Sequence, residues 1–457
     1  HTNTTASDNT AVGKHSLRQN TTGADNVAVG KDALLLNTTA SNNTAIGRHS
    51  LGANTTGTFN VAVGNYALDA NTTANGNNAI GYSALSANTT GASNSAMGQQ
   101  ALTANTTGAN NTAIGHVALG DNTTASNNTA VGYFALNANT TGAANVAVGT
   151  NTLKVNTTAN DNVAIGHDAL QANTTGALNT AVGTSALNAN TTADSNNAFG
   201  RRALYTNTTG AQNTALGYLS LYLNTTASYN TSVGVSSMQS NTTGAKNTSV
   251  GYGALTSNTT GTENVVVGEV ALDANTTGNY NTAIGRHALS SNTTASNNTA
   301  VGRNAMGDNT TGYDNVAVGR NALDANVGGH SNTALGESSL TSNTEGDRNV
   351  AVGQNALAIN STGGSNVAVG RGALDANTTA SNNTAVGDLA ATALTTGAAN
   401  VAIGTNALAA STTGARNTIV GVDSSNQITS GADNTAMGYD SLTRCTTGGS
   451  NVAIGKD

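Results

Sequence analysis

The stretch GYFALNANTTGAANVAV, residues 132–148, carries the pattern that decides the fold. Its first residue, Gly132, belongs to a column of glycines that recurs every 17 residues from Gly13 to Gly455, 27 times in all, without an insertion or deletion. Asparagine is equally regular four residues before each glycine, from Asn9 to Asn451. A fixed period of this length is typical of stacked structural units rather than of a globular domain. Positions in the repeat are numbered from this glycine, which is position 0, to position 16.

Two short segments of the repeat alternate between apolar and small residues with a period of two. Val146 and Val148 share one face, with Ala147 opposite, and Leu136 shares a face with Ala138. Such alternation predicts short half-buried strands, and the Gly, Asn and Thr residues between them favour turns. No apolar stripe with helical spacing persists. We therefore predict an all-β fold, a parallel β-solenoid in which each 17-residue coil has two strands and two turns.

The apolar columns predict how such a coil packs. We expect the leucines of position 4 and the Val or Ile residues of position 16 to fill the interior, and the alanines of positions 3 and 15 to face outward. Position 4 is interrupted late, at Ala391 and Ser425, so the C-terminal coils should be the loosest. Twenty-seven coils at the strand spacing of about 4.8 Å predict one continuous rod of about 130 Å over residues 1–457. A flat outward strip of alanine favours lateral association of identical chains, and we expect a homo-oligomer, most simply a trimer.

Composition argues against several classes of function. The net charge is -7 and only 9% of residues are charged, so the chain has no basic stripe dense enough for nucleic acid. The sequence has no run of 18 apolar residues, so it predicts no segment that inserts into a membrane. No nucleophile, phosphate-binding loop or metal-ligand spacing stands out, so we expect no enzyme, no cofactor and no metal site. The single cysteine, Cys445, is either a neutral substitution in an asparagine column or the source of an intermolecular disulfide.

Two motifs resemble known repeat families. The segment Asn60-Val61-Ala62-Val63-Gly64 resembles the core motif of trimeric autotransporter adhesin heads, and residues 105–119 resemble repeats of bacterial and phage tail-fibre-like surface proteins. The resemblance implies a left-handed, trimeric β-roll outside the cell, on a cell surface or a virion appendage. It further implies a fibre or filament shaft, or alternatively an adhesin that contacts host glycans or receptors. Because the repeats start and stop without a cap, we expect a segment of a longer fibre or a unit that joins end to end.

Two sets of candidate surface residues follow from the repeat. The Asn-Thr-Thr triplets are formal N-glycosylation acceptors, or else turn ladders, and the candidates are Asn20, Asn37, Asn54, Asn88, Asn105 and Asn139. Position 1 is basic or aromatic in many coils and predicts either a surface-contact strip or an ordinary solvated edge, with Lys14, Lys31, Arg48, Tyr82, Tyr133, Tyr218, Tyr252, Arg286, Arg303 and Arg320 as its members.

Ice binding is a minor alternative. It would need two threonines on one face, spaced as Thr-x-Thr. The threonines of this repeat are adjacent, as in Thr55-Thr56, so a strand would send their side chains to opposite faces.

Overall fold

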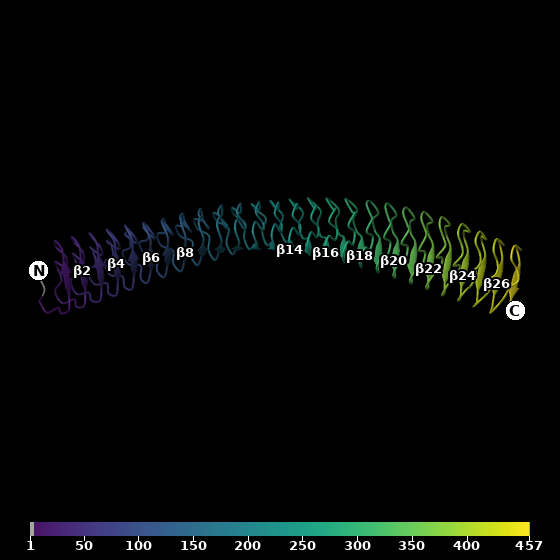
Figure 1. Cartoon of the computed structure of the whole chain (residues 1–457), viewed down its shortest axis with the longest axis horizontal. Coiled ribbons are helices and arrows are strands. Elements are labelled where there is room, and N and C mark those ends of the chain that lie inside the picture. Colours follow the sequence, from purple (N-terminus) through teal and green to yellow (C-terminus); the bar gives the residue numbers. More distant parts are fainter. Residues whose placement is uncertain (1–3, 457) are drawn as a thin grey trace. The chain divides into compact units, whose positions relative to one another are not determined.

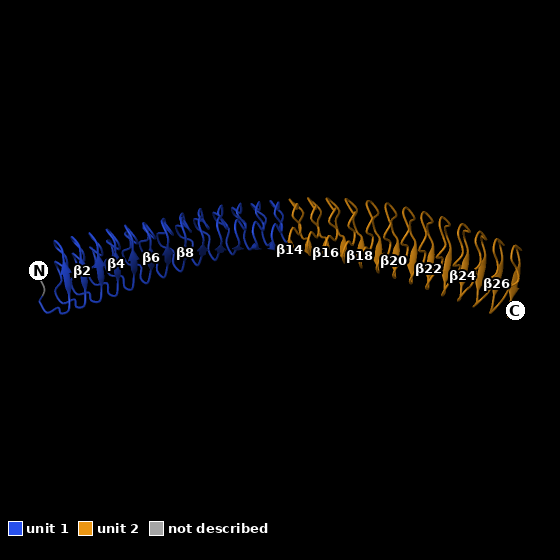
Figure 2. Ribbon diagram, in the orientation of Figure 1, with its two compact units in different colours: residues 1–229 blue, residues 230–457 orange. Residues whose placement is uncertain are grey.

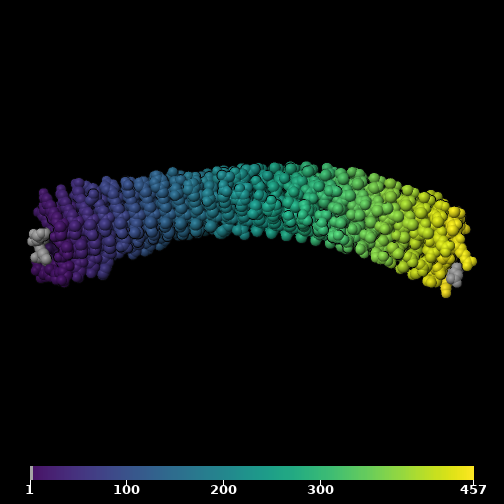
Figure 3. Space-filling model, in the orientation of Figure 1, coloured from purple at the N-terminus to yellow at the C-terminus, as the bar shows by residue number. Residues whose placement is uncertain are grey.

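The computed structural model describes residues 4–456, and those residues form short β-strands joined by turns, with no helix (Figure 1). The chain divides into two compact units, His1–Tyr229 and Asn230–Asp457, coloured separately in Figure 2. Each unit is a stack of coils, and every coil contributes one strand of three residues. Within each unit the coils form closely packed, regularly spaced rows of atoms (Figure 3).

The strands of unit 1 are β1 (Thr10–Val12), β2 (Val27–Val29), β3 (Thr44–Ile46), β4 (Val61–Val63), β5 (Asn78–Ile80), β6 (Ser95–Met97), β7 (Thr112–Ile114), β8 (Thr129–Val131), β9 (Val146–Val148), β10 (Val163–Ile165), β11 (Thr180–Val182), β12 (Asn197–Phe199) and β13 (Thr214–Leu216). Those of unit 2 are β14 (Thr231–Val233), β15 (Thr248–Val250), β16 (Val265–Val267), β17 (Thr282–Ile284), β18 (Thr299–Val301), β19 (Val316–Val318), β20 (Thr333–Leu335), β21 (Val350–Val352), β22 (Val367–Val369), β23 (Thr384–Val386), β24 (Val401–Ile403), β25 (Thr418–Val420), β26 (Thr435–Met437) and β27 (Val452–Ile454).

Successive strands within each unit pair in parallel with an offset of one repeat. In unit 1, Val146 of β9 lies opposite Val163 of β10, and Ala147 lies opposite Ala164. In unit 2 the same register pairs Thr282 of β17 with Thr299 of β18. The backbone therefore completes one full turn every 17 residues, and equivalent side chains stack along the coil axis. The predicted parallel β-solenoid with 17-residue coils is confirmed.

The prediction of a second strand in each coil is wrong. Residues 135–138 form turns, because Phe134 and Leu136 adopt left-handed backbone conformations with φ of 52°. The two residues send their amides in opposite directions along the axis: the Phe134 N–H donates to the carbonyl of His116 in the preceding coil, and the Leu136 N–H donates to Thr152 in the next coil. Residues with left-handed backbone conformations thus alternate with ordinary ones, and this satisfies the buried amides without a strand. The left-handed conformations have a conformational cost that stacking of the coils must offset.

The interior also differs from the prediction. Leu136 and the alanines Ala135 and Ala147 are fully buried, whereas Val146 and Val148 are half-exposed. The middle residue of a three-residue strand points to the face opposite its two neighbours. A coil of this size leaves room for only a small side chain beside the leucine, so the alanine points inward. The expected outward strip of alanine is therefore wrong, and the Val and Ile columns form an outer face instead.

Two asparagine columns line the interior and form ladders along the axis, and in unit 2 the position-7 ladder ends at Asn377. At position 7, the Asn37 Nδ2 donates to Oδ1 of Asn20 at 2.9 Å and to the carbonyl of Ala40 at 3.0 Å. At position 13, the Asn26 Nδ2 donates to the same Ala40 carbonyl at 2.9 Å, and its Oδ1 accepts the backbone N–H of Asn43 at 3.0 Å. The position-10 carbonyl thus accepts hydrogen bonds from both asparagine columns. The predicted role of the invariant asparagine, which is to stack along the axis and satisfy the turn, is confirmed.

The glycine of position 0 has a steric cause. Gly132 adopts φ of 138°, which L side chains rarely adopt, and a Cβ built on it would lie 2.5 Å from the carbonyl oxygen of Gly149 in the next coil. Position 10 is different, because it is Gly in most coils and Ala in others, but Ala never occupies it in two consecutive coils. A Cβ there also approaches the next coil's carbonyl oxygen, so each alanine has a glycine in both neighbouring coils.

Candidate functional site: the exposed surfaces of the coil

The predicted contact strip lies at the turn that follows each strand. The glycine of position 0 redirects the chain, and position 1 then projects from the edge of the sheet. All ten predicted members are exposed, and they divide between the units. Lys14, Lys31, Arg48, Tyr82, Tyr133 and Tyr218 belong to unit 1, and Tyr252, Arg286, Arg303 and Arg320 belong to unit 2.

In unit 1 the strip is joined by residues of position 2, which the sequence analysis did not single out. The Tyr66 ring stacks on His49 with 5.5 Å between ring centroids, and the Arg48 guanidinium lies 5.5 Å from the same ring. Tyr82 meets Tyr66 edge-on at 6.3 Å. Aromatic and cationic side chains of successive coils thus form one connected surface.

A second cluster in unit 1 has the same construction. His116 stacks on Tyr133 at 5.3 Å, Phe134 packs edge-on against Tyr133 at 4.3 Å, and the Lys154 ammonium lies 5.2 Å from the Phe134 ring. Because equivalent positions of adjacent coils lie one strand spacing apart, an aromatic at position 1 or 2 predicts contact with its counterpart 17 residues away. That signal was available in the sequence.

In unit 2 the strip contains ion pairs along the axis. Arg286 pairs with Glu269 at 3.4 Å, and Arg320 pairs with Glu337. Arg303 stands in the coil between the two arginines and has no ion-pair partner among the described residues. Exposed pairs of this kind contribute little to stability, so they chiefly set the pattern of surface charge.

One carboxylate in unit 1 lies between histidines of the adjacent coils. The Asp32 Oδ1 lies 3.0 Å from Nδ1 of His15, and its Oδ2 lies 3.4 Å from Nε2 of His49 and 3.8 Å from Nζ of Lys31. Desolvation raises the pKa of Asp32, but the hydrogen bond to His15 and the nearby positive charges outweigh it, so the pKa lies below its ordinary value. No group of three or more His, Cys, Asp or Glu side chains in residues 4–456 is arranged to hold a metal ion.

The six predicted glycosylation candidates lie inside the coil. Asn20, Asn37, Asn54, Asn88, Asn105 and Asn139 are at most 1% exposed. Their Nδ2 atoms donate within the position-7 ladder, as Asn105 does to Asn88 Oδ1 and to the Gly108 carbonyl, both at 2.9 Å. An N-glycan attaches through this same nitrogen, so it fits none of the six in the folded coil.

The adjacent threonines of the same turn separate, as their alternation predicts. Thr55 donates its hydroxyl to the carbonyl of Thr72 in the next coil at 3.0 Å, and Thr56 is exposed.

The largest surface feature that the sequence analysis missed is the outer face of the strands. Position 16 is Val, Ile, Leu, Met or Phe in every coil, and position 14 is mostly Thr or Val. Ile46, Met97 and Ile114 are 40%, 43% and 39% exposed, although they are surrounded by other apolar side chains of the same column. We call these two columns the Val/Ile face. Continuous exposed apolar surface of this length marks an interaction site in soluble proteins.

The signal for this face was the size of the side chains. Position 15 is almost always Ala, while both of its neighbours are larger. In a coil that already encloses a leucine, only the smaller set fits inside.

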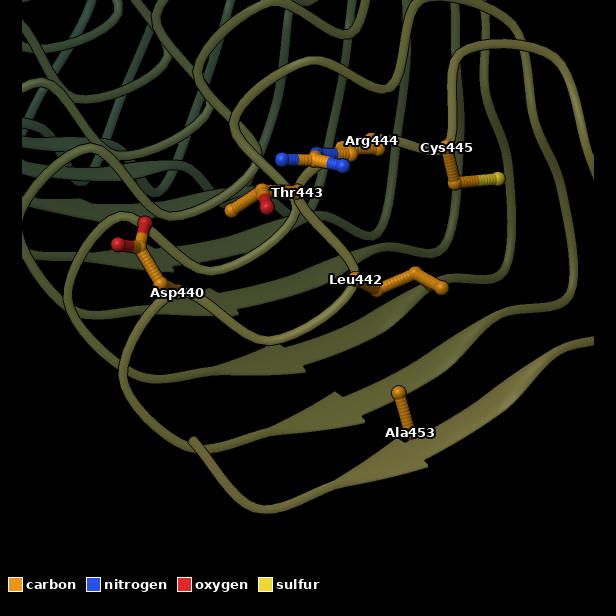
Figure 4. A pocket seen from close by; sticks show the side chains of 6 residues that line it. All are labelled: Asp440, Leu442, Thr443, Arg444, Cys445 and Ala453. Atoms are coloured by element: carbon orange, nitrogen blue, oxygen red, sulfur yellow. The ribbon is translucent and has the colours of Figure 1, made fainter. Parts of the chain in front are cut away.

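Cys445 lies in a surface pocket beside the last strands, together with Asp440, Leu442, Thr443, Arg444 and Ala453 (Figure 4). Leu442 and Ala453 belong to columns that are buried in other coils, and here both are only partly buried. Cys445 replaces the position-7 asparagine: its Sγ lies 3.5 Å from the Gly448 carbonyl and 3.8 Å from Nδ2 of Asn451. The thiol therefore occupies the place of the ladder amide, and it is free in this chain.

Comparison with known proteins places the chain in no group, because neither a protein-family model nor a curated protein matches it. Among the described residues, no helix is long and apolar enough to cross a membrane.

Proposed function

We propose that this chain is the shaft of an extracellular fibre, in which several copies, most simply three, associate side by side through their Val/Ile faces. The single observation that carries the proposal is the unbroken apolar column at position 16, half-exposed in coil after coil of each unit. A left-handed coil and a place on a cell surface or virion appendage belong to the same proposal. They rest on the resemblance of the Asn-x-Ala-Val-Gly motif to adhesin heads and tail-fibre repeats.

The size of the Val/Ile face supports association of copies. If each coil offers on the order of 100 Å² of side-chain surface, the thirteen strands of unit 1 offer over about 1,000 Å² per copy, and an ordinary stable interface needs roughly 800 Å² per partner. An exposed apolar sheet face of this length would otherwise promote aggregation. Association with sister chains removes the face from water.

The interior supports a mechanical role. Backbone hydrogen bonds, two asparagine ladders and the hydroxyls of position 8 all run along the coil axis, as in the 3.0 Å bond from the Thr106 hydroxyl to the Thr123 carbonyl. A coil that so many hydrogen bonds link to its neighbours resists bending and stretching. The candidate surface residues, by contrast, include no cluster arranged for covalent chemistry.

The test measures mass in solution. We expect the wild-type chain to have several times the 44.9 kDa mass of one chain in light scattering at micromolar concentration. The triple variant Ile80→Lys, Met97→Lys, Ile114→Lys places three charges on the Val/Ile face and should fall to the mass of one chain, with an unchanged circular dichroism spectrum. The matched control Thr73→Lys, Thr90→Lys, Thr107→Lys adds the same charges at exposed positions of the same coils and should keep its mass. A monomeric wild type would refute the assembly.

A second candidate function, adhesion, is favoured by the aromatic and basic clusters of unit 1. Stacked rings beside cationic groups, as at Arg48, His49 and Tyr66, suit the faces of sugar rings and their acidic substituents. Binding to a glycan array that is lost in Tyr66→Ala and Tyr82→Ala would support this function. If the wild type binds no glycan, the adhesion proposal fails and the fibre shaft is the only proposed function that remains.

Ice binding keeps one observation in its favour, because rows such as Thr44-Ala45-Ile46 place a hydroxyl and a methyl-rich side chain on the same flat face. A monomeric wild type that produces thermal hysteresis would assign the Val/Ile face to water instead of to a sister chain.

A further inference from the structure

Two adjacent coils of unit 2 bring a serine, a histidine and an aspartate into contact, outside the predicted surface residues. His330 and Asp347 occupy position 11 of the two coils, and Ser331 follows His330 at position 12. The Ser331 Oγ lies 3.3 Å from Nδ1 of His330, and Nε2 of the same ring lies 3.2 Å from Oδ2 of Asp347. The contact is not evident from the sequence, because His330 and Asp347 become neighbours only when the coils stack.

Asp347 fixes both the place and the tautomer of the neutral imidazole. Its Oδ1 accepts the backbone N–H of His330 at 2.9 Å, while its Oδ2 faces the ring. A carboxylate only accepts hydrogen bonds, so the ring proton belongs on Nε2, and the lone pair of Nδ1 then faces the Ser331 hydroxyl. The Tyr313 ring of the preceding coil stacks on the imidazole, with 4.8 Å between ring centroids and 15° between the planes. The imidazole is therefore held by the coils on either side of it.

Other histidines of the chain pair with a carboxylate alone. The Nδ1 atoms of His15 and His167 lie 3.0 Å and 2.9 Å from a carboxylate oxygen, and Nε2 of His49 lies 3.4 Å from one. None of the three has a hydroxyl group hydrogen-bonded to its ring among residues 4–456. A serine on one ring nitrogen and a carboxylate on the other therefore distinguish His330 from an ordinary surface ion pair. They are the parts by which a nucleophile, its base and the group that orients the base are recognised.

Arg348 adds a positive charge beside this serine. It occupies position 12 of the next coil, about 4.8 Å from Ser331 along the axis, and its backbone N–H donates to the carbonyl of His330 at 3.0 Å. Its side chain is exposed, and its guanidinium has no ion-pair or hydrogen-bond partner in the part of the chain that the structure describes. A cation so placed can stabilise the oxyanion that forms when a hydroxyl attacks a carbonyl group.

We propose that Ser331 is a nucleophile for acyl transfer from small esters, with His330 as its general base and Asp347 as the residue that positions this base. The Ser331 Oγ attacks the carbonyl carbon of the ester and passes its proton to Nδ1 of His330. The tetrahedral intermediate then expels the alcohol, which takes that proton, and the acyl group remains on Oγ. Water, deprotonated by the same Nδ1, releases the carboxylic acid and restores the serine. The activity is independent of the proposed shaft, because all of these side chains belong to one chain.

Exposure to water limits the rate of this reaction. Ser331 is exposed, and the side chains of His330 and Asp347 are each 32% exposed. Water screens the charges that stabilise a transition state, so the site lacks the advantage of a buried one. A positioned general base still accelerates proton transfer about a hundredfold. We therefore expect slow turnover of activated esters and ready acylation of Ser331.

Acetylation by p-nitrophenyl acetate, mapped by mass spectrometry of peptides, tests the proposal at the residue itself. We expect Ser331 to be acetylated in the full chain, and His330→Gln to slow this acetylation about a hundredfold. The chain contains its own control, because Ser365 also occupies position 12, is also exposed and has the same φ of 58°, but follows Gly364 instead of a histidine. Ser365 should remain unmodified, and Ser365→Ala should leave the acetylation of Ser331 unchanged.

The variant Asp347→Asn tests the positioning role. Its side-chain oxygen can still accept the backbone N–H of His330, while its amide can donate to Nε2 of the ring. The ring proton would then move to Nδ1, which could no longer accept the proton of Ser331. Nitrogen NMR of isotope-labelled histidine should therefore show the Nε2–H tautomer of His330 in the wild type and the Nδ1–H tautomer in the variant. Acetylation of Ser331 should be slower in the variant, although the fold is unchanged.

Two results would overturn the proposal. One is acetylation of Ser331 that is no faster than that of Ser365, and the other is a rate at Ser331 that His330→Gln leaves unchanged. Neither result concerns the mass of the assembly, so the proposed shaft is tested separately.

Discussion

Leu394 follows Asn377 in the position-7 column, and it leaves the side-chain oxygen of Asn377 buried without a hydrogen-bond partner. Every earlier pair of the column in unit 2 joins an amide to an oxygen, as Asn377 itself does when it donates to Oδ1 of Asn360 at 2.7 Å. A leucine has no donor to offer, so the ladder ends there. Ser411, Ile428 and Cys445 continue the column without restoring it.

Fast hydrogen exchange is expected in the coils from residue 391 onward. Four buried polar atoms in this region or next to it have no partner: Asn377 Oδ1, Ser411 Oγ, Ser425 Oγ and Asn426 Oδ1. Each such group costs about 1–3 kcal/mol, and a repeat array loses stability locally because a coil contacts only its neighbours. Mass spectrometry of exchange should find residues 391–445 less protected than residues 250–375. Equal protection would contradict both this physical argument and the sequence-based expectation of loose C-terminal coils.

The glycine of position 0 should tolerate no side chain. Gly132→Ala would place a Cβ against the Gly149 carbonyl and force φ of 138° on an alanine, so we expect a loss of about 2–4 kcal/mol. The control is Gly261→Ala at position 10, between Gly244 and Gly278, where we expect a smaller loss. The loss for Gly142→Ala, between Ala125 and Ala159, should fall between the other two losses. This variant would place alanine at position 10 of three consecutive coils, whereas the sequence never has it in two. Urea denaturation monitored by circular dichroism ranks the three, and equal effects would refute the steric reading.

Much of this architecture was readable from the sequence, and the reasons for the rest are physical. The invariant spacing of Gly132 and Asn145 in their columns fixed the 17-residue coil, the parallel register and the stacking of asparagine. Alternation alone, however, does not say which face is inside. Val146 and Val148 looked like core residues, and they lie outside because the space beside Leu136 admits only Ala147. The same alternation suggested a strand at residues 135–138, where left-handed Leu136 makes a turn.

The candidate surfaces were predicted less completely. Single members of the strip, such as Arg48 and Tyr82, were identified by exposure, but their contacts depend on position 2 as well. His49 and Tyr66 become neighbours only when the coils stack.

Asp375→Asn should stabilise the chain at neutral pH. Desolvation raises the pKa of Asp375, a half-buried residue of position 5. The folded chain therefore retains this proton at pH values where the unfolded chain has lost it. Stability is greatest below the ordinary pKa of aspartate and falls as the pH rises through the raised value. Asparagine occupies the same position at residues 137 and 188. We expect a gain below about 1 kcal/mol at pH 7, after screening by solvent, and none at pH 3.

Urea denaturation at both pH values measures the change. The control Asp161→Asn replaces an exposed carboxylate and should have a similar small effect at each pH. A destabilised Asp375→Asn at pH 7 would mean that the carboxylate makes a favourable contact that outweighs its burial.

Exchange of two side chains should repair the broken ladder. Where position 4 is the small Ala391, position 7 is the large Leu394, and the same exchange recurs at Ser425 and Ile428. Each pair keeps the buried volume of the coil nearly constant, which is what a closely packed interior requires. Ala391→Leu alone adds a second leucine to a filled coil and should cost about 1–3 kcal/mol. Leu394→Asn alone supplies a donor to Asn377 but leaves a cavity, and should cost about 2–4 kcal/mol.

The double variant Ala391→Leu, Leu394→Asn should be at least as stable as the wild type. It restores the usual pair of residues, fills the cavity and gives the Asn377 oxygen a donor. A double-mutant cycle measures the coupling, which we expect to exceed about 3 kcal/mol because the two side chains compete for one space. Protection of residues 385–400 from hydrogen exchange reports the same change locally. If the two losses of stability are additive, the two positions pack independently. The asparagine ladder would then contribute less to stability than the filling of the interior does.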